Sequence, residues 1–286
     1  MIKLCAFADE YDANLDRQIE GLIRNDVRLI EFRSAEGVNV ADMNDEQVLA
    51  AYEKLTENGI QVWSIGSPLG KVDINCDLDE YMTVVERIAR TAKLMRCDKI
   101  RGFSFYNAHD DGERVINYLG KAIEVCARYG AKIYHENEKG IYGDVPERVL
   151  KLKESLPKLR LVFDPANYVQ CGVDCYRAIE QLFPLTDYFH VKDALYSGDV
   201  VPAGKGVGAL DRIFELLQTA RKDLVLSVEP HLKVFNGFEG LERNGQMKSQ
   251  YVFDSNYSAF DCACRAVKKL LADYGFKCAE GGYVRE

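Results

Sequence analysis

The sequence lacks the features that mark membrane-spanning, secreted and multidomain proteins. No apolar run approaches the roughly 20 residues needed to cross a bilayer. The opening residues MIKLCAFADE enter a strand-like pattern directly, without the layout of a signal peptide. No Pro/Ser-rich linker divides the 286 residues. We therefore expect a cytoplasmic protein with no membrane partner, folded as a single domain over residues 1–286.

Positive charge is also in short supply. Lys and Arg total 37 against 45 Asp and Glu, which gives a formal net charge of −8. Such a balance repels the phosphate backbone of DNA or RNA, so we expect no nucleic-acid partner. A small substrate that is neutral or held by a metal ion fits this acidic balance better.

The cysteines lack the arrangement of a disulfide framework or of a closed zinc site. There are nine, an odd number, and without a secretion signal we expect reduced thiols. The close pairs are Cys171 with Cys175 and Cys262 with Cys264, and neither pair has C-x-x-C spacing. We expect these side chains to fill the core.

What the sequence does contain is a regular alternation of short apolar runs with amphipathic stretches, which is typical of parallel strands joined by helices. Helical spacing is clear at 78–95, 211–220 and 259–274. Gly59 and Gly130 precede the third and fifth strands, where glycine can close a helix in the left-handed conformation. An open doubly wound sheet is the alternative, but no G-x-G-x-x-G follows the first strand. The alternation predicts an α/β fold, a (β/α)8 TIM barrel, with strands at residues 3–8, 27–32, 61–65, 99–105, 132–136, 160–163, 188–191 and 224–228.

Polar residues close four consecutive predicted strands. They are Glu136 in KIYHENE, Asp164 in LVFDPAN, His190 in YFHVKD and Glu229 in LSVEPH. In a barrel of this kind the carboxyl ends of the strands carry the reactive groups, so the four should converge at one side of the barrel mouth. Three carboxylates and one imidazole favour a catalytic divalent ion such as Mn²⁺, Mg²⁺, Co²⁺ or Zn²⁺. The alternative is that these carboxylates only cap helices or pair with lysines.

Further polar residues follow the predicted strands. Any one of them could instead be a helix cap or part of a surface ion pair. His135 precedes Glu136 and should point to the other face of its strand, as a structural, hydrogen-bonded histidine. The candidates for contact with substrate are Glu31, Lys71, Arg101, His109, Asn167, Lys192 and His231.

Together these residues resemble the sugar phosphate isomerase/epimerase group of xylose isomerase-like TIM barrels. The resemblance covers nearly the whole chain and rests on HENEKGIYGD, FDPANY, HVKDA followed by VVPAGKGVG, and SVEPH. It implies a single divalent ion held by Glu136, Asp164, His190 and Glu229, with the two glutamates as acid and base on either face of the substrate. A related endonuclease branch holds three zinc ions with many histidines, and the four histidines here are too few for that cluster.

The resemblance implies a metal-dependent isomerase or epimerase of a sugar or sugar phosphate, working through a metal-stabilised enediolate. In ketose 3-epimerases of this group a histidine that contacts substrate lies three residues after the metal-binding aspartate. Here that position is Asn167, which disfavours a ketose 3-epimerase. An inosose dehydratase-like lyase and a non-catalytic sugar-binding barrel are the alternatives, and retention of both glutamates disfavours the second.

The segment 232–254 is long, aromatic-rich and poorly periodic, so eight regular units do not need it. Such a segment lies at the barrel mouth, where it can cover the site and exclude water. We expect a lid with some contribution to a homodimer, because aromatic residues are enriched in interfaces. The alternative is a loop folded onto its own barrel rim. The aromatic residues concerned are Phe235, Phe238, Tyr251 and Phe253.

Overall fold

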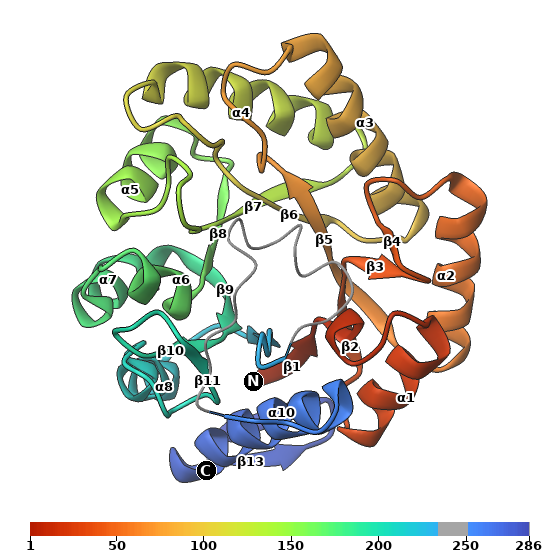
Figure 1. The fold of residues 1–286 in the computed structure, drawn as a ribbon, viewed down its shortest axis with the longest axis vertical. Helices are drawn as coiled ribbons and strands as arrows, with labels where there is room; N and C mark the ends of the chain where they lie inside the picture. Colours follow the sequence, from red (N-terminus) through yellow and green to blue (C-terminus); the bar gives the residue numbers. More distant parts are fainter. Residues whose placement is uncertain (234–250, 286) are drawn as a thin grey trace.

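The computed structural model describes residues 1–233 and 251–285. Its centre is a closed barrel of eight parallel strands, viewed end-on in Figure 1, in which β12 pairs with β1 to complete the ring. This confirms the predicted (β/α)8 fold. The barrel strands are β1 (Ile2–Ala6), β2 (Leu29–Phe32), β5 (Gln61–Leu69), β6 (Lys99–Gly102), β7 (Lys132–Glu136), β8 (Arg160–Phe163), β9 (Thr186–Val191) and β12 (Leu224–Val228).

Helices surround the barrel on its outside (Figure 1). The three helices predicted by periodicity are present as α3, α8 and α10, and α10 begins before residue 259 because Ser255 and Ser258 form a capping box. Gly59 and Gly130 follow α2 and α4 with φ of 69° and 81°, the left-handed conformation that was expected. The helices are α1 (Leu15–Arg24), α2 (Asp45–Glu57), α3 (Leu78–Leu94), α4 (Gly112–Arg128), α5 (Pro146–Ser155), α6 (Pro165–Gln170), α7 (Cys175–Leu182), α8 (Leu210–Thr219) and α10 (Asn256–Asp273).

The structure corrects several strand boundaries. β6 ends at Gly102 rather than at residue 105, since Phe105 adopts a φ of 65° that no strand accommodates. β5 continues to Leu69, four residues beyond the predicted end, through an irregularity in its pairing with β6. These two changes lie on the side of the barrel mouth, where the chain leaves regular pairing. At the amino-terminal ends, β2 begins at Leu29 rather than at residue 27 and β9 begins at Thr186 rather than at residue 188.

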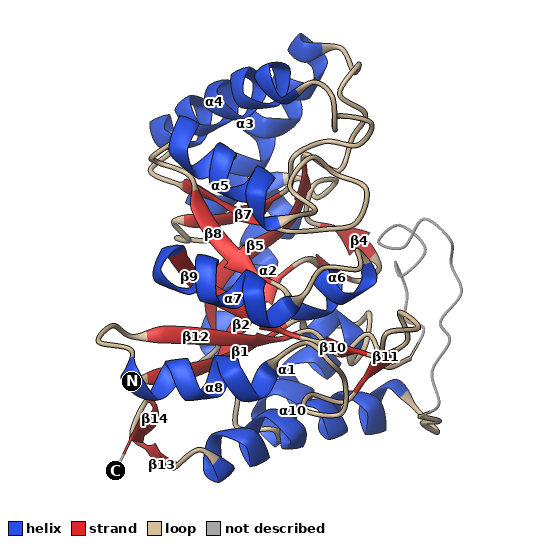
Figure 2. Ribbon diagram, turned by 90° about the vertical axis from the view of Figure 1, so that its left-hand side faces the viewer, coloured by secondary structure: helices blue, strands red, loops and turns tan. Residues whose placement is uncertain are grey.

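Short hairpins extend the barrel at both ends. β3 (Ser34–Ala35) with β4 (Val38–Asn39), and β10 (Asp193–Ala194) with β11 (Val200–Val201), lie at the carboxyl ends of the strands, on the right of Figure 2. At the opposite end, β14 (Gly282–Arg285) pairs antiparallel with β1 and with β13 (Phe276–Ala279). This last hairpin was not predicted from the sequence.

Alternate residues of the strands face the barrel interior in two layers. The apolar layer lies toward the amino-terminal ends of the strands and consists of Cys5, Leu29, Trp63, Tyr134, Val162, Tyr188 and Val225. The intervening residues, such as Ile133 and Phe189, point outward into the core shared with the helices. The polar layer lies two residues further along the chain and consists of Glu31, Glu136, Asp164, His190 and Ser227, with Glu229 one further step along.

The cysteines and the lengths of the helices can be compared directly with what the sequence predicted. All nine cysteines are free thiols, as expected for a chain without a disulfide framework. Within the described part of the chain, every helix is too short or too polar to cross a bilayer.

Candidate metal centre

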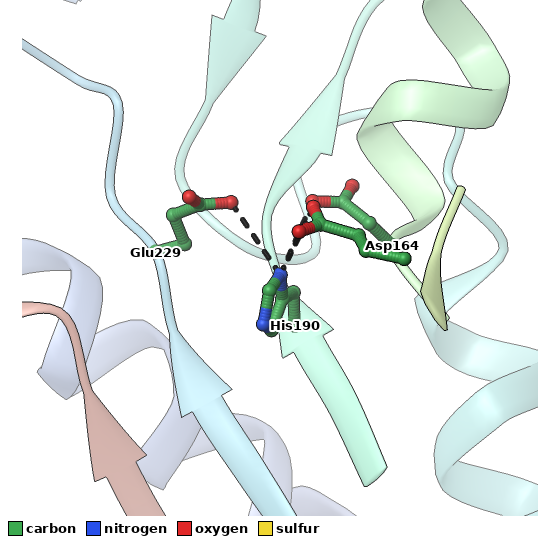
Figure 3. Close-up of side chains that lie close together, drawn as sticks. Asp164, His190 and Glu229 are labelled. Carbon is green, nitrogen blue, oxygen red and sulfur yellow. Dashed lines mark ion pairs between the residues drawn. The ribbon is translucent and has the colours of Figure 1, made fainter. Parts of the chain in front are cut away.

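His190 stands at the centre of the polar layer, and its ring nitrogen Nδ1 faces three carboxylates. Glu136 Oε1 lies 3.1 Å from Nδ1, Glu229 Oε2 lies 3.7 Å away and Asp164 Oδ2 lies 3.9 Å away. Figure 3 shows Asp164 and Glu229 on either side of the ring, both turned toward this nitrogen. One ligand atom from each of the four residues lies within 4.8 Å of all the others. The structure thus brings together the four residues expected to bind metal.

The donor set fits a divalent ion. All four side chains are buried, and His190 Nδ1 makes no hydrogen bond among the described residues. A buried imidazole nitrogen that is surrounded by three carboxylate oxygens has the chemistry of a mixed nitrogen and oxygen ligand set. In the ion-free protein, burial opposes protonation of His190, but Glu136 and Glu31 outweigh it and raise the pKa of the ring above its ordinary value.

The opposite nitrogen of His190 is held by Glu31. Nε2 lies 3.1 Å from Glu31 Oε2, and the same carboxylate accepts hydrogen bonds from the Tyr188 hydroxyl at 2.8 Å and the Ser227 hydroxyl at 2.9 Å. Glu31 was expected to contact substrate, but it lies behind the ring, in the same layer, because inward positions on β2 and β9 meet inside the barrel. In the neutral ring with Nε2–H donated to Glu31, the lone pair of Nδ1 would face the three carboxylates, which is the tautomer of a carboxylate–histidine–metal triad.

Glu136 and Glu229 each have one carboxylate oxygen that faces His190 and one outer oxygen that faces away from it. An arginine holds the outer oxygen in both residues. Arg101 Nη1 donates to Glu136 Oε2 at 2.8 Å, and Arg33 Nη1 donates to Glu229 Oε1 at 3.2 Å. Both guanidinium groups lie over the Phe7 ring, 4.5 Å from its centre for Arg33 and 5.3 Å for Arg101. Each glutamate is therefore fixed with its other oxygen directed toward His190.

These contacts keep both glutamates ionised. Burial raises the pKa of each carboxyl, but nearby cations outweigh it. His190 and Arg101 lower the pKa of Glu136, and Lys192 is the main group that lowers the pKa of Glu229. At neutral pH both groups are carboxylates.

Arg33 was missed by the sequence analysis, together with two acidic residues that hold it. Its guanidinium forms a bidentate pair with Asp9, at 2.8 and 2.9 Å, and lies 3.2 Å from Glu10. Asp9 and Glu10 belong to a 3-10 turn, η1 (Ala8–Glu10), that directly follows β1. The only sequence signal was their place just after the first predicted strand, in AFADE.

Glu10, Glu229 and His231 also lie close enough together to hold an ion. However, the Arg33 guanidinium already contacts Glu10 and Glu229, both at 3.2 Å. Positive charge is thereby supplied at this second position by the protein itself.

Lys192 and Asn167 contact the expected ligands directly. Lys192 Nζ lies 2.9 Å from Asp164 Oδ2 and 2.8 Å from Glu229 Oε2. The backbone N–H of Asn167 donates to Asp164 Oδ1 at 2.9 Å, which caps α6, and its side-chain amide donates to Glu136 Oε1 at 3.1 Å. Burial raises the pKa of Asp164 to about 7, against the opposing effect of Lys192.

The remaining candidates occupy different places. Lys71 Nζ pairs with Glu138 at 2.8 Å, two residues beyond Glu136. His231 Nε2 lies 3.5 Å from Glu229 Oε1, at the edge of the cluster. His109 is half exposed and contacts Asp144 at 2.9 Å, in the segment after β7, rather than any of the four expected ligands. Strand alternation places His135 outside the barrel, as expected, where its Nε2 lies 2.9 Å from the Ser104 hydroxyl.

Asp193 organises the loop that follows β10. Its carboxylate accepts hydrogen bonds from the backbone N–H groups of Ala194, Gly204, Gly206 and Gly208, all at 2.8 to 3.0 Å. A Cβ atom at Gly206 would lie 2.3 Å from Asp193 Oδ1, so glycine is required for this close approach. Asp193 lies in HVKDA and its glycine partners in VVPAGKGVG, but no role for Asp193 was predicted from these segments.

The expected aromatic lid falls mainly outside the described residues, which exclude Phe235 and Phe238. Phe253 is described: it is partly buried against the core, and its carbonyl oxygen accepts a hydrogen bond from Lys233 at 2.8 Å. The lid and its part in a homodimer remain predictions.

Solved structures share this fold at low sequence identity. An L-ribulose 3-epimerase superposes with a TM-score of 0.73 at 16% identity, covering 96% of both chains. The IOLI protein, solved with a bound zinc atom, gives a TM-score of 0.72 at 16% identity over 95% of this chain and 99% of its own. The probable 3-DHS dehydratase AsbF of Bacillus anthracis gives 0.69 at 15% identity over 94% and 99%.

The family assignment comes from the sequence. No curated protein matches the chain significantly. A family model described as xylose isomerase-like TIM barrel matches residues 25–234, which is most of the chain. The match includes seven of the eight barrel strands and all four residues of the cluster, which are Glu136, Asp164, His190 and Glu229. The chain belongs to the xylose isomerase-like TIM barrel family.

Proposed function

We propose that this protein is an isomerase or epimerase of a sugar or sugar phosphate that depends on one divalent metal ion. The observation that carries the proposal is the cluster of Glu136, Asp164, His190 and Glu229, whose ligand atoms lie within 4.8 Å of one another. Mn²⁺, Mg²⁺, Co²⁺ and Zn²⁺ all suit this donor set. When bound, such an ion would supply Lewis-acid chemistry: it polarises a carbonyl group, acidifies the adjacent C–H and stabilises the resulting enediolate charge.

The two glutamates supply the proton transfers in this proposal. They come from β7 and from the end of β12, which are separated in the barrel by β8 and β9, so they approach a substrate from different sides. In the reacting form one glutamate is a carboxylate and removes the proton from the acidified carbon. The other glutamate first takes up a proton from solvent or substrate and then returns it to the opposite face or to the neighbouring carbon. Their lowered pKa values support the base role, since both are ionised at neutral pH. The result is epimerisation or aldose–ketose isomerisation.

The surrounding residues orient the site. Arg101 and Arg33 fix the outer oxygens of the glutamates, at 2.8 and 3.2 Å, and Glu31 orients His190. We assign the substrate hydroxyls to the polar groups that border the cluster. These groups are Lys71, Arg101, Asn167, Lys192 and His231, with His109 further out on the rim.

A dehydratase is the second candidate, favoured by Asn167. This residue replaces the histidine expected in a ketose 3-epimerase, and its amide donates to Glu136 at 3.1 Å instead of leaving an imidazole for substrate. If a hydroxyl lies β to the acidified carbon, the same residues remove the α-proton and protonate the leaving hydroxyl, so that the C–O bond breaks and water is released.

One experiment separates these functions. Purified protein is analysed for metal, and then ketoses, inososes and their phosphates are incubated with it and Mn²⁺ in deuterated water. We expect about one divalent ion per chain and deuterium exchange at the α-carbon without loss of water. Loss of water identifies the dehydratase, and sugar binding without exchange identifies a binding protein. Three ions per chain, or none after added Mn²⁺, would contradict the proposed centre.

The proposed partners follow from charge and from the aromatic segment. The net charge of −8 supports a small-molecule partner in the cytoplasm rather than a nucleic acid. The segment 232–254 supports a homodimer. Light scattering after size-exclusion chromatography, on the intact protein and on a variant with its four aromatic residues changed to Ser, tests the dimer; a monomer with unchanged substrate affinity in the variant rejects both roles of the segment.

A further inference from the structure

Lys192 holds the same oxygen atoms that the proposed metal ion needs. Its Nζ lies 2.9 Å from Asp164 Oδ2 and 2.8 Å from Glu229 Oε2. These two atoms are the ones that face His190 Nδ1, at 3.9 and 3.7 Å. The ammonium therefore uses lone pairs that a divalent ion bound to His190 would also use.

The two arginines make a different kind of contact. Arg101 binds Glu136 Oε2 and Arg33 binds Glu229 Oε1, whereas the oxygens that face His190 Nδ1 are Glu136 Oε1 and Glu229 Oε2. The arginines can keep these contacts when an ion binds. Lys192 must either share Asp164 Oδ2 and Glu229 Oε2 with the ion or move away from these atoms.

Burial makes this competition strong. The Lys192 side chain is 2% exposed, and those of Asp164 and Glu229 are 0% and 3% exposed. Buried carboxylates without a nearby cation are costly, and so is a buried ammonium without a carboxylate. In the ion-free protein, Lys192 supplies the positive charge that these two ligands require.

We infer that Lys192 is an internal competitor of the divalent ion. This inference rests on the metal centre proposed above. Its ammonium neutralises Asp164 and Glu229 while the ion is absent, and binding of the ion displaces it from them. The displaced ammonium is then available to donate a hydrogen bond to a substrate oxygen. Because coupling between two binding events is reciprocal, a ligand that engages Lys192 tightens the binding of the ion.

Lys192→Met tests this directly, because Met keeps the length of the side chain and removes its charge. Wild type and variant are stripped with EDTA, and Mn²⁺ is titrated by calorimetry. We expect Mn²⁺ to bind the variant tighter by roughly 10-fold or more, within the usual range of coupling between sites. The stripped variant should also melt at a lower temperature than stripped wild type, and added Mn²⁺ should remove that difference.

Lys71→Met is the matched control. Lys71 is also a buried lysine, 7% exposed, but it pairs with Glu138 rather than with the four ligands. Its loss should leave Mn²⁺ affinity unchanged. If Lys192→Met does not fold without the ion, it is refolded with Mn²⁺ and its affinity is measured by competition with a chelator. Lys192→Arg, which keeps the charge, should bind Mn²⁺ no tighter than wild type.

The outcomes separate this inference from the proposed function. Tighter binding in Lys192→Met, with wild-type affinity in Lys71→Met and no tighter binding in Lys192→Arg, supports the competition. Equal or weaker binding in the variant, with normal binding in wild type, overturns the competition and leaves the metal centre intact. Absence of binding in both proteins overturns the competition and the metal centre together.

Discussion

The apolar and polar layers of the barrel interior differ by only two residues along the same strands. Leu29 precedes Glu31, Tyr134 precedes Glu136 and Tyr188 precedes His190, all on inward positions. The first residue of each pair lies nearer the amino-terminal end of its strand and packs against apolar neighbours. The second residue takes part in the charged cluster. One strand therefore supplies both a packing residue and a functional residue, depending only on height in the barrel.

The comparison also separates stability from function. Burial of the apolar layer favours folding, because it removes apolar surface from water. The polar layer concentrates buried charges, and a buried ion pair is weak evidence for stability since desolvation opposes its attraction. We expect substitutions in the apolar layer to change the free energy of unfolding, and substitutions in the polar layer to change metal binding and turnover.

The largest effect should come from Leu29→Ala in the apolar layer. Removing this buried side chain should lower the free energy of unfolding by roughly 2–5 kcal/mol, through lost burial and the cavity left behind. Mn²⁺ affinity should stay unchanged. Urea unfolding measures the free energy of unfolding, and titration calorimetry measures the Mn²⁺ affinity. Leu49→Ala on α2, where Leu49 is 41% exposed, is the surface control and should change stability by about 0.5 kcal/mol or less. A parallel loss of metal affinity in Leu29→Ala would show that the layers are not separable.

Next in size are Glu136→Gln and Glu229→Gln in the polar layer. Each should reduce turnover by roughly 10²-fold or more, the effect of removing a positioned acid or base. Metal content must be measured with the rate, since both residues also belong to the proposed ligand set. Cys171→Ser and Cys175→Ser should keep nearly full activity. Near-normal turnover in both Gln variants, with metal retained, would reject the two-glutamate mechanism.

Glu31→Gln tests the contact between the layers. Glu31 accepts from Tyr188 at 2.8 Å and lies 3.1 Å from His190 Nε2. Loss of its charge should weaken Mn²⁺ binding by roughly 10- to 100-fold, as for other partners of metal-binding histidines. Tyr188→Phe removes one hydrogen bond to Glu31 and keeps its charge, so its Mn²⁺ affinity should fall less. Equal losses in both variants would assign the effect to packing.

The smallest effect concerns His135, which lies on the outer side of β7. Burial lowers its pKa from 6.5 to about 4, so the folded protein binds fewer protons than the unfolded chain between these values. Its contribution to stability is present above pH 6.5 and is lost as the pH falls toward 4. His135→Gln should make the fall of unfolding free energy over this range shallower. An unchanged slope would show that other groups control the acid transition.

The alternation of short apolar runs with amphipathic stretches made the barrel strands predictable, and the polar residues that close four of these runs made the cluster predictable. This pattern placed Glu136, Asp164 and His190 at equivalent heights because parallel strands end together at the barrel mouth. It did not reveal that Glu31 faces the back of His190, since a strand pattern gives the direction of a side chain but not its partner across the barrel.

The contacts outside regular strands were not predictable in this way. Asp9 and Glu10 reach Arg33 through the η1 turn, whose geometry no periodicity encodes. The β13–β14 hairpin follows the last helix, beyond the eight units that close the barrel, and its turn uses glycines at positive φ. In both places the chain is shaped by pairing between distant segments.

The loop around Asp193 has a consequence for engineering. One carboxylate holds this loop through four backbone N–H groups, so its path depends on glycines rather than on the intervening side chains. Lys205 is exposed and lies between two of these glycines, whereas Ala203 and Val207 pack against the core. Position 205 can therefore be randomised while 204, 206 and 208 stay glycine, and such a library samples new side chains in this loop without disturbing its path.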